Sequence, residues 1–248
     1  MKHLFTILTA LFYLAPHVHA QVDTINPATN KLLMQRLQPG THSYAVFTMD
    51  SITKEIGYSD IWVRSVAFSK RNGEPVVNFG WKWYRHDSLF RDVHDICLRK
   101  NLQPIYAHTL LKGTTVVAVN FNDTAMVAAD SIANNKVDAK KKVLLNPPVY
   151  NWEWDMETFG LLPITKVGQK FMIAFLDPFD VKAAYYPHTV TGTDELALND
   201  EVKIKCWILR VNYNAEAYAD FWISRQSHQM LKMREYYKGK YRFKVMLY

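Results

Sequence analysis

The chain has 248 residues, of which 49% are hydrophobic and 14% aromatic. This composition supports a sizeable core and excludes an intrinsically disordered protein. The formal net charge is +7, and the basic residues are dispersed except for a lysine run at 140–142. Such a dispersed surplus is typical of a solvated surface.

The N-terminal residues 1–20 have the three parts of a secretory signal peptide. Lys2 and His3 form a short polar start, an apolar run covers residues 4–15, and Ala20 is the small residue before the expected cleavage point. The run is shorter than the roughly 20 apolar residues that a transmembrane helix needs. We expect cleavage near Ala20-Gln21 and a periplasmic or secreted protein with no transmembrane segment, for which nucleic acid is a poor partner.

The first half of the expected mature chain is mainly strand. A short helix is predicted near residues 26–38, where Pro39-Gly40 would end it. After it the dominant period is two, and Asn72-Gly73 marks a tight turn. The predicted strands lie within residues 44–49, 62–68, 77–83, 105–111, 115–121 and 124–132. This spacing favours an antiparallel sheet of sequential neighbours.

The second half interrupts this rhythm and then resumes it. Residues 133–150 form a looser connection, and apolar residues at helical spacing predict one short helix within 152–162. From 171 to 248 the two-residue period returns, and near the end Phe243 and Val245 alternate with Arg242 and Lys244. One face of such a strand is buried and the other is wet or faces a cavity. We expect residues 21–248 to form a single β-rich domain.

No catalytic, metal or cofactor motif is convincing in the sequence. Residues 51–54 match Ser-x-x-Lys, but they lie where a strand ends and the companion motifs of the acyl enzymes are missing. His86 and His94 lie among aspartates without a metal-ligand spacing, and a solvated turn and strand edge explains them better. We therefore predict a protein that is not an enzyme, with no metal site and no cofactor.

The two cysteines, Cys97 and Cys206, leave two alternatives open. In an oxidising compartment an even pair can form a disulfide. However, they lie far apart in different predicted strands, and Cys206 alternates with apolar residues on a face that reads as buried. Burial of each cysteine as a small hydrophobe is the competing interpretation.

Aromatic residues are the most distinctive feature, with 7 Trp, 14 Tyr and 13 Phe. Many of them belong to a large β core. The functional interpretation is a groove or cavity whose walls take a lipid tail or stack on a ring. The candidate ligand-binding positions are Trp81, Trp83, Trp152 and Trp154.

The last hundred residues carry a family resemblance. The residues that carry it are Trp154, Asp155, Leu162, Pro163, Val190, Gly192, Glu195, Cys206, Trp207, Phe221, Trp222, Ile223, Leu231 and Lys232. In this pattern the chain resembles a domain-of-unknown-function family of exported bacterial proteins, common in Bacteroidetes, that is similar to the outer-membrane lipoprotein-sorting carriers. The resemblance implies a mainly β fold, a strongly curved antiparallel sheet forming a half-open barrel, with one or two short helices packed on or inside it.

These observations lead to three functional hypotheses. The first is a non-enzymatic periplasmic protein that binds a lipid-like or other apolar ligand in an apolar concavity of several hundred Å³ and serves envelope assembly. The second is a module that binds an envelope protein or a glycan through an exposed aromatic patch. The third is a hydrolase whose site no motif reveals, which a cleft with a perturbed titratable group would indicate.

Overall fold

The computed structural model describes residues 22–247, whose strands form one 16-stranded sheet. The expected signal peptide, residues 1–20, lies outside the described residues. Within them, no helix combines the length and the apolar character that crossing a bilayer requires.

The elements follow the chain in this order: β1 (Val22–Ile25), η2 (Met34–Arg36), β2 (Gly40–Asp50), β3 (Ile56–Arg71), β4 (Glu74–Arg85), β5 (Ser88–Leu98), β6 (Pro104–Leu111), β7 (Thr115–Phe121), β8 (Ala125–Ala128), β9 (Lys142–Leu144), β10 (Tyr150–Asn151), η3 (Trp152–Trp154), α2 (Asp155–Gly160), β11 (Lys170–Leu176), β12 (Ala184–Ala197), β13 (Lys203–Asn214), β14 (Ala217–Ser224), β15 (Met230–Tyr237) and β16 (Lys240–Leu247).

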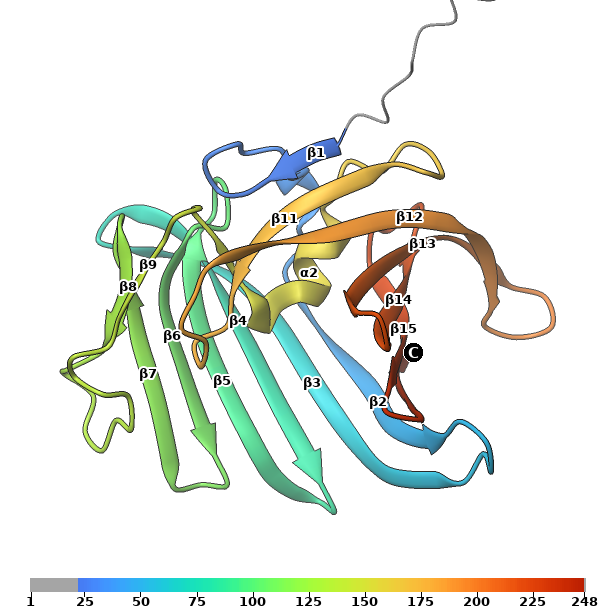
Figure 1. Cartoon of the computed structure of the whole chain (residues 1–248), viewed down its shortest axis with the longest axis horizontal. Helices are drawn as coiled ribbons and strands as arrows, with labels where there is room; N and C mark the ends of the chain where they lie inside the picture. The colour runs from blue at the N-terminus through green and yellow to red at the C-terminus, as the bar shows by residue number, and fades with distance from the viewer. Residues whose placement is uncertain (1–21, 248) are drawn as a thin grey trace, which may run out of the picture.

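The sheet is built almost entirely from sequential antiparallel neighbours. Strands β2 to β9 form one limb and β11 to β16 form the other, and the limbs join where β16 pairs with β2. Parallel pairing occurs where β1 and β10 lie against β11. The sheet curves strongly and holds the short helix α2 on its concave side (Figure 1). This confirms the predicted mainly β, curved fold.

Tight turns between strands follow the turn residues of the sequence. Asn72 and Gly73 both have positive φ, +51° and +86°, between β3 and β4. Both central residues of a type I′ turn need this conformation, and its twist matches that of the flanking strands. The turn fixes the register of β3 on β4, in which Trp62 is opposite Trp83. The turn that was read from the sequence therefore positions two of the aromatic side chains described below.

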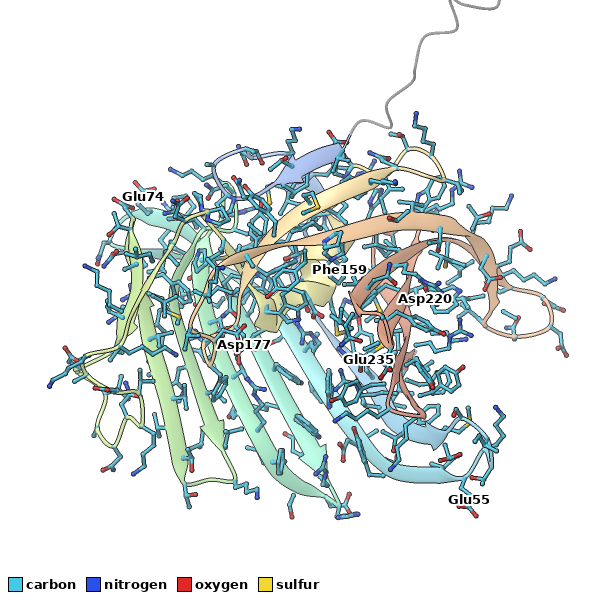
Figure 2. All side chains as sticks on the ribbon, viewed as in Figure 1. Glu55, Glu74, Phe159, Asp177, Asp220 and Glu235 are labelled. Carbon is cyan, nitrogen blue, oxygen red and sulfur yellow. The ribbon has the colours of Figure 1, made fainter. Side chains whose placement is uncertain are left out.

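The core fills the space between the concave face of the sheet and the η3–α2 segment. Phe159 of α2, labelled in Figure 2, is 1% exposed and packs against Phe221 of β14, with ring centroids 4.8 Å apart. Burial of aromatic side chains of this size provides most of the driving force for wrapping the sheet around the helix. The helix predicted within 152–162 is thus present as η3 and α2.

A smaller apolar cluster joins the two limbs where no strands pair. It contains Val119, Met126 and Val143 from one limb and Ala174 and Leu176 from β11 of the other. In the sheet order, β9 ends one side and β1 the other. Side-chain packing, without a backbone ladder, therefore closes this seam in the described part of the chain.

One sequence expectation was wrong, and one open alternative was decided. The helix predicted near residues 26–38 is instead β1 followed by a turn and the single-turn η2. Asn26 caps the turn by accepting a hydrogen bond from the Thr29 amide at 2.8 Å, and this local bond competes with helix formation. On β16 the sequence left open whether the charged face is wet or faces a cavity, and in the structure it faces the interior: Lys244 is 5% exposed, whereas Phe243 is half-buried on the outer face.

Candidate functional site

A hollow lies on the concave side of the sheet, between β3–β5, β13–β16 and the η3–α2 segment. Its volume is about 170 Å³. Its lining residues are Trp62, Arg64, Trp81, Trp83, Arg91, Trp152, Glu153, Asp155, Asp177, Tyr213, Phe221, Met233, Arg242 and Lys244. The walls are therefore both aromatic and charged, which corrects the expectation of an apolar concavity.

A wider outer part of about 630 Å³ adjoins this hollow and opens to solvent. The two spaces share Trp152, Asp177, Tyr213 and Arg242 in their linings. Asp177 and Glu235, which are labelled in Figure 2, both border the outer part. We call the outer part the mouth and the first space the inner hollow. Aromatic side chains dominate the mouth: Trp152, Phe179, Tyr186, Tyr213 and Tyr237.

The structure brings three of the four candidate tryptophans to this site. Trp81, Trp83 and Trp152 line the inner hollow. Trp154 does not: it is fully buried and packs on Phe79, with ring centroids 4.8 Å apart. Side chains two positions apart on a helical turn point in different directions, so Trp152 and Trp154 do not face the same surface.

Sequence reasoning missed Trp62, which completes an aromatic wall. Its ring centroid lies 4.5 Å from that of Trp81 and 5.3 Å from that of Trp83. The wall forms because alternate residues of β3 and β4 face inward, and the register places Trp62 opposite Trp83 and Arg64 opposite Trp81. The alternation of Trp62 with Val66 was the signal that could have identified it.

Buried ion pairs attach the η3–α2 segment to this wall. Arg64 bonds Glu157 of α2 at 2.5 Å and donates to the carbonyl of Glu153 at 2.8 Å. Burial alone would lower the pKa of Arg64, but the neighbouring Glu157 carboxylate raises it above its usual value. Arg91 pairs in the same way with Glu153. These contacts fix the helix at the position where it bounds the hollow.

Behind the hollow, Glu153 belongs to a network of buried polar groups. Its carboxylate accepts hydrogen bonds from Arg91, from Thr109 at 3.0 Å and from Asn151 at 3.4 Å. Asn151 also donates to Asp95 at 3.1 Å. Burial and the adjacent Glu153 raise the pKa of Asp95 well above its usual value. Asp95 does not line the hollow, so this network supports the wall.

Lys244 is a buried cation on the opposite wall. It forms no ion pair with the described residues, and its Nζ contacts Met156 Sδ at 3.9 Å. Burial lowers its pKa to about 8, against the opposing effect of the Asp155 charge. At neutral pH the ammonium form therefore predominates inside the hollow.

Asp177 lies at the boundary between the inner hollow and the mouth, directly after β11. Burial, with the nearby Glu153 charge, raises the pKa of Asp177 to about 6. The inner hollow and the mouth have no Ser, Cys or His in their linings. The titratable groups that face the ligand space are therefore carboxylates, arginines, tyrosines and one lysine.

The remaining candidates lie elsewhere. Cys97 of β5 and Cys206 of β13 are both buried and free on separate strands, so of the two alternatives left open by the sequence the structure has the buried thiols. Ser51 and Lys54 lie in an exposed turn after β2, outside any helix. Among residues 22–247, no three His, Cys, Asp or Glu side chains are grouped to hold a metal ion.

Comparisons with known proteins show the family of this chain and a distant similarity of its fold to a solved structure. The family model described as "Protein of unknown function (DUF3108)" matches residues 43–246. A β-barrel-like protein of the domain of unknown function DUF1849 from Brucella abortus is 12% identical, with a TM-score of 0.49, over 86% of this chain and 97% of that one. Among curated proteins, none matches the chain.

Proposed function

The chain belongs to the DUF3108 family of proteins of unknown function, and we propose that it is a non-enzymatic exported protein that binds one lipid-like molecule. The observation that carries this proposal is the inner hollow of about 170 Å³ that adjoins an aromatic mouth of about 630 Å³. Pockets for small organic ligands have volumes of roughly 300–1,000 Å³, so the inner hollow holds only part of such a ligand and the mouth holds the rest.

The chemistry of the walls makes the proposed ligand amphipathic. Trp62, Trp81 and Trp83 offer flat apolar surface, whereas four basic and three acidic residues line the same inner hollow. Burying a purely apolar molecule against these charges would remove their hydration without replacing it. A molecule with a hydrocarbon tail and a polar head satisfies both parts of the wall.

The non-enzymatic part of the proposal rests on the lining. Nucleophilic catalysis needs a Ser, Cys or similar group beside a base, and the linings of the hollow and mouth contain no Ser, Cys or His. Asp177 has a raised pKa and could act as a general acid or base, so an acid–base hydrolase is the competing assignment. The hydrolase assignment would be correct if the protein hydrolysed ester or glycoside substrates and D177N abolished this activity.

The proposed location and pathway rest on sequence patterns. The signal-like residues 1–20 support export, and the resemblance to lipoprotein-sorting carriers that we inferred from the sequence motifs is the reason for proposing a role in moving lipid-modified molecules through the envelope. N-terminal sequencing of the exported protein tests the first point, with Gln21 expected as the first residue. An intact N-terminus in the cytoplasmic fraction would contradict it.

Native mass spectrometry of the exported chain tests the binding proposal. The protein is isolated gently from a periplasm, and the spectrum is compared with that of an organic extract of the same sample. We expect one amphipathic molecule per chain, with lower occupancy in A217W, because Ala217 borders the mouth and a tryptophan there narrows it. A197W, an exposed position on β12, is the matched control. A ligand-free mass, with no uptake of added fatty acid or phospholipid, would refute binding.

A second candidate, a protein- or glycan-binding module, is favoured by one specific observation. Five half-buried rings form a continuous row on the outer face of β2, β16, β15 and β14, with neighbouring centroids 5.1 to 6.1 Å apart. They are Phe47, Phe243, Tyr241, Tyr236 and Tyr218. Binding of an envelope glycan that Y241A weakens and A217W leaves unchanged would favour this candidate.

A further inference from the structure

The inner hollow has an excess of hydrogen-bond donors. Among residues 22–247, four of its lining side chains keep a buried N–H without an acceptor: Trp62 Nε1, Trp81 Nε1, Arg91 Nε and Arg242 Nε. Trp62 and Trp81 are 3% and 8% exposed. No carboxylate or carbonyl of the protein satisfies these donors, although acidic residues belong to the same walls.

Physical chemistry makes this concentration informative. A buried donor without a partner destabilises the folded state, and folded proteins contain few of them. The three lining carboxylates already accept other hydrogen bonds. Glu153 accepts from Arg91, Thr109 and Asn151, whereas Asp155 and Asp177 each accept from a backbone amide. The walls therefore match a ligand that brings acceptors and needs no donors.

Lys244 adds a positive charge to the same space. Its Nζ lies 4.6 Å from the ring centroid of Trp62, and no described carboxylate forms an ion pair with it. The three arginines of the lining differ, because Arg64, Arg91 and Arg242 pair with Glu157, Glu153 and Glu235. Lys244 is the cation of the lining that a ligand can pair with directly.

We infer that the inner hollow binds the oxyanionic head group of the amphiphile, a carboxylate or a phosphate, between Lys244 and the four unpartnered N–H groups. This inference rests on the proposed function and names the ligand class of that site. The tail leaves through the mouth, past the aromatic side chains Trp152, Tyr213 and Tyr237. The head group therefore enters first.

A cationic head group fits this site poorly. An ammonium group would leave the four donors without acceptors and would lie near Lys244, Arg64 and Arg242. Two of the three lining carboxylates are paired or peripheral: Glu153 pairs with Arg91, and Asp177 lies at the mouth boundary. The third, Asp155, accepts a hydrogen bond from the Met156 amide, and its charge already acts on Lys244. A neutral alcohol would satisfy one donor and leave the charge of Lys244 unpaired.

Calorimetry with four ligands of equal tail length tests the inference near neutral pH. The exported chain is titrated with decanoate, decyl phosphate, decanol and decyltrimethylammonium, each below its critical micelle concentration. We expect decanoate or decyl phosphate to bind at least about tenfold more tightly than decanol, because a charged hydrogen bond contributes roughly 1.5–3 kcal/mol. The tighter of the two identifies the head group as carboxylate or phosphate.

Two variants assign the effect to the proposed groups. K244M removes the cation at similar side-chain length, and W81F keeps a ring while removing the N–H. We expect K244M to weaken binding of the anionic ligand by about tenfold or more and W81F by a smaller factor, with decanol unchanged. K70M, an exposed position on β3, is the matched control. Should K244M not fold, W81F still provides the test.

The outcomes separate the two proposals. Equal binding of decanol and the anions, insensitive to K244M and W81F, would overturn the head-group inference and leave ligand binding intact. Preference for decyltrimethylammonium would overturn it in the same way. If none of the four amphiphiles binds, the proposed function and the inference both fail.

Fluorescence quenching tests the orientation. In W152F, tryptophans 62, 81 and 83 remain on the inner wall. Decanoate with bromine beside the carboxylate should quench them more strongly than decanoate with bromine at the tail end, because heavy-atom quenching requires close approach. Stronger quenching from the tail end would overturn the head-first orientation.

Discussion

The Nζ of Lys244 on β16 lies 4.6 Å from the ring centroid of Trp62 on β3. Strand β2 lies between the two strands and pairs with both. The last strand of the chain thus supplies a cation to an aromatic wall that the first limb builds. A buried lysine without a carboxylate partner lowers stability unless something binds it. The first prediction follows from this relationship.

K244M should be more stable than the wild type at about pH 7. Burial lowers the pKa of Lys244 from 10.5 to about 8, so the folded state binds its proton less tightly than the unfolded state does. The stability cost is fully present below pH 8 and disappears as the pH rises from 8 to 10.5. Its size is about 3 kcal/mol from this shift.

Urea unfolding at several pH values checks this prediction for Lys244. The difference in unfolding free energy between K244M and the wild type should shrink between about pH 8 and pH 10.5. A constant difference across that range would mean that the lysine is not held as a strained cation. K70M serves again as the control for loss of a surface charge.

Asp177 should make binding of an anionic amphiphile depend on pH. Because its pKa is raised to about 6, lowering the pH through that value removes a negative charge at the mouth boundary. The charged groups around it are Glu153, Arg91 and Asp180. Decanesulfonate, whose head stays ionised, should bind about threefold more tightly or better at pH 5 than at pH 7.5. D177N should bind decanesulfonate at both pH values with the affinity that the wild type has at pH 5.

The Arg64–Glu157 pair should be required for attachment of α2. R64M leaves Glu157 and the Glu153 carbonyl without their donor, and we expect a loss of about 3–5 kcal/mol in unfolding free energy. The double variant R64M/E157M should recover part of this loss, because it removes the unpaired charge. If the loss in R64M/E157M equalled the sum of the losses in R64M and E157M, the two residues would not be coupled.

Gly160 should tolerate no side chain. A Cβ there would lie 2.1 Å from the carbonyl oxygen of His228, which is backbone and cannot rotate away. G160A should cost about 1–3 kcal/mol as the helix end shifts from β14–β15. In G192A the nearest atom, on Ile208, is 3.9 Å from the new Cβ. Thermal unfolding should therefore leave G192A close to the wild type, and equal losses in both variants would contradict this explanation.

Cys97 and Cys206 should react as two free thiols once the chain unfolds. Both are 0% exposed, and burial raises the pKa of each, that of Cys206 to about 11. A thiol reagent should therefore label the folded chain very slowly and label both residues in denaturant without reductant. Recovery of no reactive thiol would indicate a disulfide.

The strand limbs and the short helix were predictable because each has a local signal. The period of two identified β3 and β4, and Asn72-Gly73 fixed their turn. Their register then brought Trp81 and Trp83 to the same wall. The sequence did not predict that the helix would be only the single turn η2. The competing turn at Asn26 depends on hydrogen bonds, and the spacing of apolar residues gives no information about them.

The charged part of the site was hidden for a different reason. Alternation on β16 identifies two faces but does not say which one turns inward. The usual rule assigns the apolar face to the core, whereas Arg242 and Lys244 line the hollow and the neighbouring aromatic residues lie outside. A concave sheet with polar inner walls departs from that rule, and such departures are expected at functional sites.

The seam between the two limbs has a consequence for the size of the molecule that the protein can accommodate. A closed barrel has a girth fixed by its strand number and stagger. Here packing of side chains such as Val143 and Leu176 spans the gap, and apolar contacts are non-directional. The limbs can therefore spread without breaking a strand ladder. Under the proposed function, the seam is therefore the part of the molecule that would adjust to the girth of the bound ligand.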